Sequence, residues 1–291
     1  MNILLLGSTG QLGSELYEIL PKFGAVHAYD YPDIDLSDFD GMRALIREIK
    51  PDVIYNATAY TAVDRAESDV ELAEAINARG ARILAEEAAK LDALLIHYST
   101  DYVFDGTKGA PYLESDATHP LNVYGSSKLH GEQEIEAVGG SYLIFRTSWV
   151  YSLRNESGFV KKVLGWARKN ETLSIVDDQI SAPTWARTLA ELSTEILKEG
   201  LPALKEKSGL YHLCGKGYCS RYDWAKEILA LDPAKDEQIV KEMRTAKSSD
   251  FPVPAQRPTF SAMDCSLFEK TFNLEIPAWG ESLAKAFQAE R

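Results

Sequence analysis

Tyr124 and Lys128 are the residues whose types and spacing first indicate chemistry in this sequence. On a helix, side chains four residues apart project from the same face about one turn apart, so a phenol and an ammonium would share one small site. The lysine charge favours the phenolate and is expected to lower the tyrosine pKa from its ordinary value of about 10. Tyr124 is therefore a candidate proton donor. Tyr222 and Lys226 have the same spacing, so the context of each pair must decide between them.

A strand-like segment upstream supplies that context for Tyr124. The apolar residues 94–98 predict a buried strand, which would deliver Thr100 and Asp101 to the carboxyl end of a sheet. Open α/β sheets bind their ligands at this edge. Tyr124 follows after a turn-rich passage, whereas no such strand precedes Tyr222. The order of the segments therefore favours Tyr124 as the functional member of the two.

The N-terminal segment carries a glycine pattern typical of dinucleotide binding. The apolar run at 3–6 predicts a parallel strand, and it leads into a loop with Gly7, Gly10 and Gly13 that opens a helix. Glycines there let the backbone turn sharply and approach a pyrophosphate at the helix N-terminus, although a plain strand-to-helix turn has the same pattern. A second strand ends at Asp30, where an acidic side chain can bind the hydroxyls of an adenosine ribose. Because a carboxylate would repel a 2′-phosphate, Asp30 favours NADH over NADPH.

The first half of the chain alternates strands and helices, which predicts an α/β fold with a doubly wound parallel sheet of the Rossmann type. The small residues at 57–61 follow the third strand, and they either line the ligand edge or pack tightly there. The amphipathic segment 69–91 is given a structural role only. The expected strands are 3–6, 25–29, 53–56, 94–98 and 142–146, and the expected helices run to about Pro21 and over 37–50 and 69–91.

Beyond Trp149 the pattern is less regular and rich in aromatic residues and proline, which indicates a second, smaller α/β lobe that binds substrate. We assign residues 1–170 to an NAD(P)-binding domain and residues 171–291 to the second lobe, with part of 205–232 returning to the first domain. The expected elements are helices near 157–169, 183–199 and 220–230, and strands near 173–176 and 210–213.

The composition excludes several functional classes. Lys and Arg number 31 against 44 Asp and Glu, and the net charge of −13 argues against general affinity for nucleic acid or an anionic membrane. No apolar run approaches the roughly 20 residues of a membrane span, and the N-terminus shows no signal-peptide pattern, so we expect a cytoplasmic protein. Cys214, Cys219 and Cys265 lack the spacing of a metal site and are expected to be buried or free thiols.

With the glycine loop, Asp30, Thr100 and the Tyr124/Lys128 pair in this order, the chain resembles the extended short-chain dehydrogenases/reductases. Within that group it resembles the dTDP-4-dehydrorhamnose reductase family. The resemblance covers almost the whole chain, and its motifs are specific. They include Gly10-Gln11-Leu12-Gly13, residues 61–67, residues 97–106, residues 120–125, residues 145–151, Asp178-Gln179, Ala182-Pro183-Thr184 and Arg257-Pro258.

The resemblance implies roles for individual residues. Tyr124 is the acid, Lys128 is its partner and a ligand of the cofactor ribose, and Thr100 hydrogen-bonds the sugar carbonyl. Asp101 and Trp149 match substrate-contacting positions, although Trp149 also suits a core residue. The positions that match cofactor contacts are Gly10, Gln11, Leu12, Asp30, Asp35, Leu36, Ala59, Tyr60, Thr61 and Tyr98.

Three positions in the last lobe bear on the substrate. Arg257 either clamps a phosphate or anchors this lobe. Ser181 stands where the family usually has glycine, which is expected to alter a loop beside the substrate. Gln256 stands where the family usually has arginine, which removes a positive charge near the expected diphosphate site. Some relatives dimerise with Mg²⁺, so a homodimer and Mg²⁺ are further expectations of the resemblance, although no closed set of metal ligands is apparent in the sequence.

The activity that the resemblance implies is NADH- or NADPH-dependent reduction of the 4-keto group of dTDP-4-dehydro-L-rhamnose, a nucleotide-sugar substrate. A 4,6-dehydratase of the same fold typically has glutamate after the Thr-Asp pair, where this chain has Tyr102. Two alternatives stay open: a reductase or epimerase of another nucleotide-linked keto-deoxysugar, and a non-catalytic NAD(P)-binding regulatory subunit. The presence of Thr100, Tyr124 and Lys128 together favours an enzyme.

Overall fold

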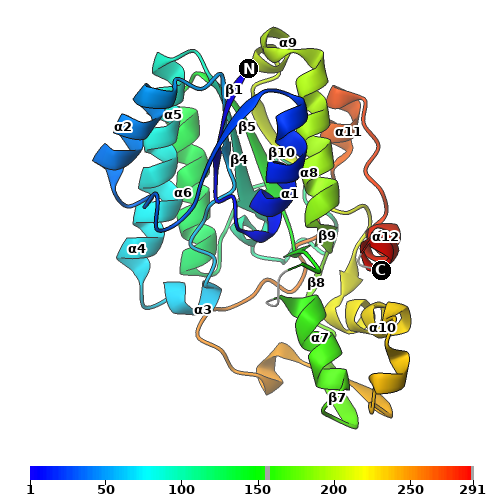
Figure 1. The fold of residues 1–291 in the computed structure, drawn as a ribbon. Coiled ribbons are helices and arrows are strands. Elements are labelled where there is room, and N and C mark those ends of the chain that lie inside the picture. The colour runs from blue at the N-terminus through cyan, green and yellow to red at the C-terminus, as the bar shows by residue number, and fades with distance from the viewer. Residues whose placement is uncertain (155–157, 290–291) are drawn as a thin grey trace.

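The computed structural model describes residues 1–154 and 158–289. In this part of the chain, six parallel strands form a central sheet in the order β2-β1-β3-β4-β5-β10, and helices cover both of its faces (Figure 1). This arrangement confirms the predicted doubly wound α/β fold. The strands are β1 (Asn2–Leu6), β2 (Ala25–Tyr29), β3 (Val53–Asn56), β4 (Leu94–Thr100), β5 (Ser141–Thr147) and β10 (Gly209–His212).

The short apolar runs become central strands because both faces of the sheet are covered. Ile3 and Leu5 of β1 point into one hydrophobic cluster, while Leu4 and Leu6 point into the other. These four side chains are fully buried. The predicted strands are therefore confirmed at nearly the predicted residues.

Two layers of helices pack on the sheet. The layer over the first cluster consists of α1 (Gln11–Ile19), α8 (Ala186–Glu195), α9 (Leu201–Glu206) and α11 (Ser266–Phe272). The layer over the second cluster consists of α2 (Phe39–Ile49), α5 (Gly80–Lys90) and α6 (Val123–Val138). The helix α2 begins after Asp38, whose carboxylate accepts a hydrogen bond from the Gly41 N–H at 3.1 Å, as expected for a helix cap.

The predicted helix over 69–91 is continuous but not uniform. It consists of α4 (Val70–Glu74), a wider π-helical turn at Ala75–Arg79 and α5, and the short helix α3 (Val63–Ala66) precedes it. The π-helical turn places Asn77 against the loop that follows β3. Such turns often occur at functional sites.

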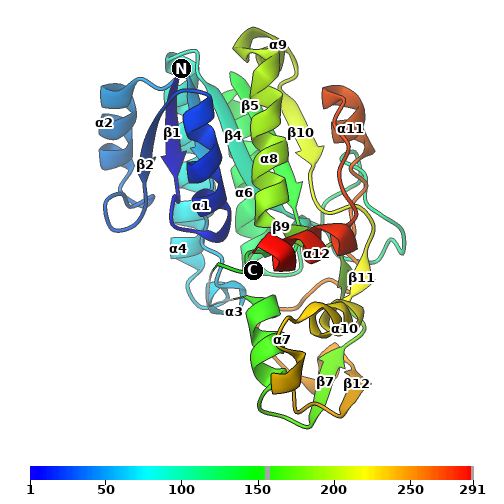
Figure 2. The same ribbon diagram turned by 45° about the vertical axis from the view of Figure 1, so that its right-hand side comes forward.

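A smaller lobe lies beyond the carboxyl edge of the sheet (Figures 1 and 2). Its own core gathers Trp224, Tyr151 and Phe287 with aliphatic side chains. The part of the predicted helix 157–169 that falls on residue 157 lies outside the described residues. The elements of the lobe are α7 (Phe159–Ala167), α10 (Arg221–Leu231) and α12 (Trp279–Ala289), with strands β6 (Val150–Tyr151), β7 (Thr172–Val176), β8 (Ile180–Ser181), β9 (Thr184–Trp185), β11 (Cys219–Ser220) and β12 (Glu242–Ala246).

Segments from the second half of the chain return to the sheet. The strand β10 pairs with β5, and α8 lies beside α1 on the same face (Figure 2). Elements on both sides of residue 170 therefore share the sheet, and the division of the chain at that residue stays a prediction.

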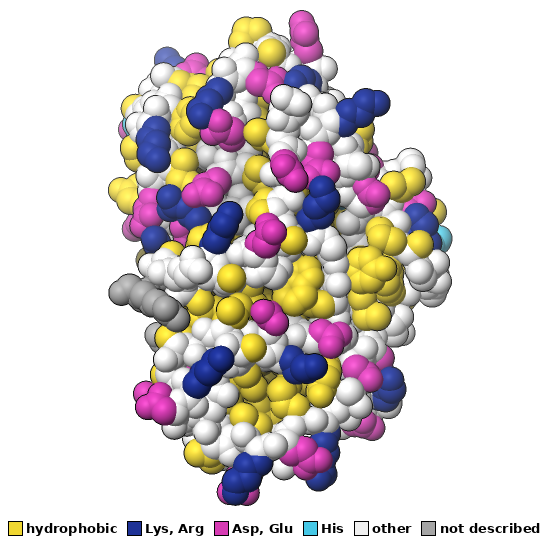
Figure 3. Space-filling model, turned by 90° about the vertical axis from the view of Figure 1, so that its right-hand side faces the viewer, with side chains coloured by type: hydrophobic (Ala, Val, Ile, Leu, Met, Phe, Trp, Pro, Cys, Tyr) yellow, Lys and Arg dark blue, Asp and Glu magenta, His cyan; other side chains and the backbone are white. Residues whose placement is uncertain are grey.

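The surface charges, the helix lengths and the cysteines are those of an ordinary globular α/β protein. Acidic and basic side chains are interspersed over the face shown in Figure 3. Within the described ranges, no helix has both the length and the apolar character needed to cross a membrane. Cys214 and Cys219 are buried, Cys265 is half-buried, and all three are free thiols.

Candidate active site

A cavity of about 690 Å³ opens at the carboxyl ends of β1, β3 and β4, where the strand order of the sheet reverses. This is the position at which doubly wound sheets bind ligands. The predicted site residues that line it are Gly7, Gly10, Gln11, Leu12, Asp30, Asp35, Leu36, Ala59, Thr61, Tyr98, Thr100, Asp101, Tyr124, Lys128 and Trp149. The fold thus brings most of the predicted set to one place. Gly13, Tyr60 and Arg257 are not among the lining residues.

The glycine loop closes tightly between β1 and α1. Gly7 has a φ of +83°, and a Cβ there would lie 2.9 Å from the Ala57 backbone. A Cβ on Gly13 would lie only 1.8 Å from the Gly7 carbonyl oxygen, so this glycine permits the close contact between helix and loop. Gly10 ends the loop, and the first turn of α1 faces the cavity with no side-chain cap. These features fit a bound pyrophosphate, because the free N–H groups of a helix N-terminus attract anions.

Asp30 lies at the end of β2, as predicted, and its carboxylate is held by the glycine loop. Its Oδ2 accepts hydrogen bonds from the Thr9 N–H at 2.8 Å and from the Thr9 hydroxyl at 2.6 Å. Asp35 lines the same end of the cavity. Among the described lining residues the basic ones are Lys128 and Arg221, and both come from other elements than the β2 turn. The end of the cavity beside Asp30 is therefore acidic.

The loop after β3 is fixed by Asn77. Its side-chain oxygen accepts a hydrogen bond from the Tyr60 N–H at 2.8 Å, and its Nδ2 donates to the Ser127 hydroxyl at 2.9 Å. The Tyr60 side chain donates to Asp69 at 2.7 Å, and its cofactor contact stays a prediction. The expectation that the helical segment 69–91 is only structural missed this positioning contact. The signal available in the sequence was one polar residue on an apolar helix face.

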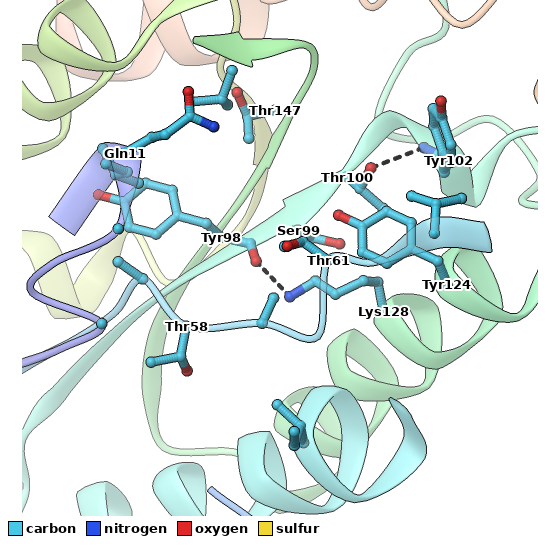
Figure 4. A pocket seen from close by; sticks show the side chains of 18 of the residues that line it. Gln11, Thr58, Thr61, Tyr98, Ser99, Thr100, Tyr102, Tyr124, Lys128 and Thr147 are labelled. Atoms are coloured by element: carbon cyan, nitrogen blue, oxygen red, sulfur yellow. Dashed lines mark hydrogen bonds between the residues drawn. The ribbon is translucent and has the colours of Figure 1, made fainter. Parts of the chain in front are cut away.

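Thr100 and Tyr124 project their hydroxyls toward the same part of the cavity (Figure 4). Thr100 is the last residue of β4, and Tyr124 lies in the first turn of α6, which Asn122 caps by accepting from the Gly125 N–H at 2.8 Å. A Cβ on Gly125 would lie 2.2 Å from the Tyr102 carbonyl oxygen, so glycine lets the start of α6 approach the end of β4 closely. Tyr102 packs edge-on against Tyr124, with ring centres 5.8 Å apart.

The expected effect of Lys128 on the tyrosine pKa is wrong in this structure. Burial raises the pKa of Tyr124 well above its ordinary value, and a hydrogen bond with the Thr100 hydroxyl opposes this only in part. Lys128 instead donates to the Tyr98 carbonyl oxygen at 2.7 Å (Figure 4). For the pKa of Tyr124, the loss of hydration therefore outweighs the charge of Lys128, which points at the strand backbone.

Lys128 is itself almost completely buried. Burial lowers its pKa to about 8, and the negative charge of Glu132 acts in the opposite direction. Glu132 pairs with Arg146 at 2.6 Å and accepts a hydrogen bond from the Ser99 hydroxyl. This buried pair gives Arg146 a structural role.

Asp101 forms a buried cluster with residues of the second lobe. Ser181 donates to its Oδ2 at 3.0 Å, and Ser261 donates to the same oxygen at 2.5 Å. Burial raises the pKa of Asp101 to about 6, while these hydroxyl groups and the charge of Arg221 act in the opposite direction. Ser181, the departure from the family pattern, thus joins the two lobes directly beneath the cavity.

Arg221 is a lining residue that the sequence did not reveal. It opens α10, and its guanidinium carbon lies 3.6 Å from the ring centre of Trp149. Trp149 also stacks on Trp224, so it is both a wall of the cavity and a part of the second core. The only local signal for Arg221 is Ser220, which caps α10 and places the arginine in its first turn.

Arg257 anchors the last lobe in this structure. Its Nη2 donates to Asp64 Oδ2 at 2.8 Å, and its Nη1 donates to Asp64 Oδ1 and to the Ala255 carbonyl oxygen. A phosphate contact for Arg257 would replace this pair and stays a prediction. At the second departure from the family pattern, the Gln256 carbonyl oxygen accepts a hydrogen bond from Asn122 at 2.7 Å.

Comparison with known proteins decides the family. The family model described as "RmlD substrate binding domain" matches residues 1–291. A dTDP-4-dehydrorhamnose reductase of Escherichia coli K12 is 40% identical over 286 residues, which cover 96% of this chain and 94% of that protein. This protein belongs to the dTDP-4-dehydrorhamnose reductase family.

Solved structures of family members have the same fold. The dTDP-4-dehydrorhamnose reductase of Clostridium acetobutylicum superposes with a TM-score of 0.91 at 35% identity, covering 100% of this chain and 99% of that one. The Bacillus anthracis dTDP-4-dehydrorhamnose reductase, solved in complex with NADP, gives a TM-score of 0.90 at 32% identity, with 100% and 99% covered. The predicted resemblance is confirmed, and the protein is an oxidoreductase that uses a nicotinamide cofactor.

The expectation of Mg²⁺ came from the resemblance to the dTDP-4-dehydrorhamnose reductase family. Across the ranges 1–154 and 158–289, no group of three or more His, Cys, Asp or Glu side chains is arranged to hold a metal ion, so the structure lends no support to Mg²⁺.

The second Tyr-x3-Lys pair lies outside the cavity. The Lys226 ammonium sits 6.0 Å from the Tyr222 ring centre on α10, which leaves Tyr124 and Lys128 as the pair in the cavity.

Proposed function

We propose that this protein reduces the 4-keto group of dTDP-4-dehydro-L-rhamnose to give dTDP-L-rhamnose, with NADH or NADPH as the reductant. The observation that carries the proposal is the placement of Thr100, Tyr124 and Lys128 in the same cavity as the glycine loop. A carbonyl held there would face two hydroxyl groups on one side and the cofactor on the other.

In this proposal the dinucleotide and the nucleotide sugar bind in different parts of the same cavity. Gly10, Gln11 and Leu12 would hold the pyrophosphate at the start of α1, and Asp30 would hold the adenosine ribose. When bound, the nicotinamide supplies the hydride for the carbonyl carbon. Trp149 and Arg221 form the wall toward the second lobe, where the nucleotide part of the substrate would lie.

Tyr124 is proposed as the proton donor. Its raised pKa keeps the phenol protonated at neutral pH, which a general acid requires before it reacts. Its proton passes to the carbonyl oxygen as negative charge develops there. The Thr100 hydroxyl is proposed as a second donor to the same oxygen, and donors aimed at developing charge contribute most to the rate.

The acidic end of the cavity supports NADH as the preferred cofactor. Asp30 and Asp35 lie where the adenosine ribose is expected, and a 2′-phosphate would have to approach both carboxylates. Since the Bacillus anthracis relative is solved with NADP, we propose that both cofactors bind and that NADH gives the lower KM.

Tyr102 supports a reduction over a dehydration. A 4,6-dehydratase needs an acid and a base for the removal of water, and the residue after Asp101 is a tyrosine packed against Tyr124. Position 102 therefore has no carboxylate to take part in the removal of water. An epimerase that shares the Tyr-x3-Lys pair would return its cofactor unchanged after each cycle.

The test is a cofactor-consumption assay with the purified protein and dTDP-4-dehydro-L-rhamnose, run separately with NADH and NADPH. We expect loss of nicotinamide absorbance and formation of dTDP-L-rhamnose, identified by mass spectrometry and NMR. Tyr222→Phe is the matched control, because that tyrosine has the same spacing to a lysine outside the cavity. Conversion of the sugar without net oxidation of the cofactor would indicate an epimerase, and no reaction at all would refute the proposal.

A further inference from the structure

His97 lies beneath Lys128 in the buried part of the site, where none of the proposed chemical steps uses it. It is the fourth residue of β4, between the proposed active-site lysine and the neighbouring strand β3. Its Nε2 lies 3.1 Å from Lys128 Nζ, and its Nδ1 lies 2.9 Å from Asn56 Nδ2. The three residues are each about 99% buried, so bulk water does not compete for the contacts between them. Their hydrogen-bonding roles must therefore fit one another.

The backbone of Thr58 fixes the orientation of the Asn56 amide. The Thr58 N–H, which can only donate, faces one side-chain atom of Asn56 at 3.2 Å, and the Thr58 hydroxyl contacts the same atom at 2.5 Å. That atom must be the amide oxygen, because a nitrogen there would place two donors against each other. The Asn56 NH₂ group consequently points at His97 and donates to Nδ1.

This orientation selects one tautomer of His97. A ring nitrogen that accepts a hydrogen bond carries no proton, so the neutral imidazole must carry its proton on Nε2. Burial, followed by the charge of Lys128, holds the pKa of His97 well below its ordinary value, so the ring is neutral. The Nε2–H therefore points at Lys128 Nζ.

An ammonium at Lys128 would meet this N–H as a second donor. A neutral amine has two N–H groups and one lone pair, and it satisfies every contact in the structure. One N–H donates to the Tyr98 carbonyl oxygen at 2.7 Å, and the lone pair accepts from His97 Nε2–H. The second N–H is left for a group in the cavity. An ammonium has three donors and no lone pair, so the contact with the His97 N–H disfavours the charged form of Lys128.

We propose that His97, held by Asn56 in the tautomer protonated on Nε2, is a positioning residue that sets the protonation of Lys128. The inference rests on the proposed function in so far as Lys128 acts in the reduction. It adds to the Tyr124/Lys128 pair a buried relay that runs from Asn56 through His97 to the lysine. Neither Asn56 nor His97 is among the described residues that line the cavity.

Other groups around Lys128 favour either its charged or its neutral form. From its own helix, Glu132 favours the charged form, but this carboxylate is already paired with Arg146 from β5. Tyr124 on α6 is held as the neutral phenol by its burial, and Tyr98 on β4 presents its carbonyl oxygen. Burial is the largest effect on the Lys128 pKa, which it lowers to about 8. The His97 N–H acts in the same direction as burial, and so would move the loss of the proton toward the pH at which the enzyme works.

The tautomer can be observed without any assay of the reaction. In protein labelled with heavy nitrogen at histidine, long-range proton–nitrogen NMR spectra distinguish a ring protonated on Nε2 from one protonated on Nδ1. The signal of His97 is assigned by its loss in His97→Phe. We expect a neutral ring protonated on Nε2 throughout the range from about pH 6 to about pH 9. A proton on Nδ1, or a ring that titrates in this range, overturns the proposal.

The effect on Lys128 is measured through the pH dependence of NADH binding, followed by nicotinamide fluorescence. Affinity for the anionic cofactor should fall as Lys128 loses its proton, and the midpoint reports that step in the free protein. His97→Phe keeps the shape of the ring but removes the N–H, so we expect this midpoint to rise by about one pH unit. A midpoint that stays in place or falls in the folded variant overturns the proposal.

Tyr55→Phe is the matched control for lost buried polarity. Its hydroxyl donates to the Ser193 carbonyl oxygen at 2.8 Å, on the opposite face of the sheet from Lys128. We expect this variant to lower thermal stability without moving the midpoint. The two proposals fail in different ways. If no sugar is reduced but His97 carries its proton on Nε2, only the proposed function falls, whereas reduction by a protein with the other tautomer removes only the role of His97.

Discussion

The guanidinium of Arg221 lies over the ring of Trp149, with its central carbon 3.6 Å from the ring centre. In the described part of the chain, no carboxylate lies within salt-bridge distance of this arginine, although Asp101 is near enough to influence its pKa. Burial lowers the pKa of Arg221, and the charge is nevertheless retained because arginine loses its proton only under strongly basic conditions. A half-buried cation that faces a cavity is suited to an anionic ligand, such as the diphosphate of a nucleotide sugar.

Replacing Arg221 should therefore weaken substrate binding more than catalysis. For Arg221→Met we expect KM for the nucleotide sugar to rise about 10- to 100-fold, as for the loss of a charged hydrogen bond, with a smaller change in KM for NADH. Arg221→Lys should recover only part of this loss, because lysine lacks the planar group that stacks on Trp149. Lys226→Met is the control, since Lys226 lies against Tyr222 on the same helix but outside the cavity. Equal effects of the two methionine variants would contradict a role in binding.

Removal of the Tyr124 hydroxyl should separate binding from turnover. In Tyr124→Phe we expect kcat to fall by about 100- to 10,000-fold, the usual contribution of a general acid, while NADH binding stays within a few-fold. Steady-state kinetics and fluorescence titration measure the two quantities. Tyr222→Phe should retain normal kcat, because that hydroxyl lies 3.4 Å from the Met243 carbonyl oxygen in the second lobe. Near-normal turnover in Tyr124→Phe would remove this residue from the acid role.

Much of the site was predictable because parallel topology places strand ends together. The glycine loop follows β1, Asp30 follows β2, and Thr100 ends β4, so the order of strands alone brings these residues to one edge. Tyr124 joins them because Gly125 allows α6 to begin next to the end of β4. Each of these relations follows from where a strand ends or a helix begins.

The remaining features depend on contacts between distant segments. Arg221 reaches the cavity only because α10 packs against Trp149, some seventy residues earlier in the chain. The contact of Lys128 with the Tyr98 carbonyl oxygen could not be predicted from the sequence either. A four-residue spacing specifies a shared helix face and not the direction of a long side chain. Asn56 shows no sign in the sequence that it orients His97. These are tertiary relations, and only the assembled sheet brings them about.

The close contact at Gly13 provides a test of the glycine loop. In Gly13→Ala the new methyl group would lie 1.8 Å from the Gly7 carbonyl oxygen, and backbone atoms would have to move. We expect a loss of at least about 3 kcal/mol in the free energy of unfolding and loss of NADH binding. Gly165→Ala is the matched control in the helix α7, where a Cβ meets nothing within 4 Å. That variant should be neutral or more stable by up to about 1 kcal/mol, measured by urea unfolding.

The Asp101 carboxyl should make stability depend on pH in a particular direction. Its pKa rises from 3.8 to about 6, so the folded state holds this proton more tightly than the unfolded state does. Ionisation of Asp101 therefore lowers the free energy of unfolding. This loss is absent below about pH 4 and complete above about pH 6, where it amounts to about 3 kcal/mol. Asp101→Asn, whose amide oxygen can still accept from Ser181 and Ser261, should therefore be more stable than the wild type at pH 7.5 by up to about that amount, with the difference vanishing toward pH 4.

Asp105 provides the control of opposite sign for this prediction. Hydrogen bonds from the Thr107 N–H and from the Tyr112 hydroxyl lower the pKa of Asp105, so its carboxylate stabilises the folded state above its unfolded pKa and loses that contribution in acid. Asp105→Asn should thus be less stable than the wild type at pH 7.5, with the deficit shrinking as the pH falls. Thermal unfolding of both variants between about pH 4 and about pH 8 measures the two trends. If Asp101→Asn showed the same sign as Asp105→Asn at pH 7.5, the buried carboxylate at position 101 would be stabilised by its serine partners and not strained by loss of water.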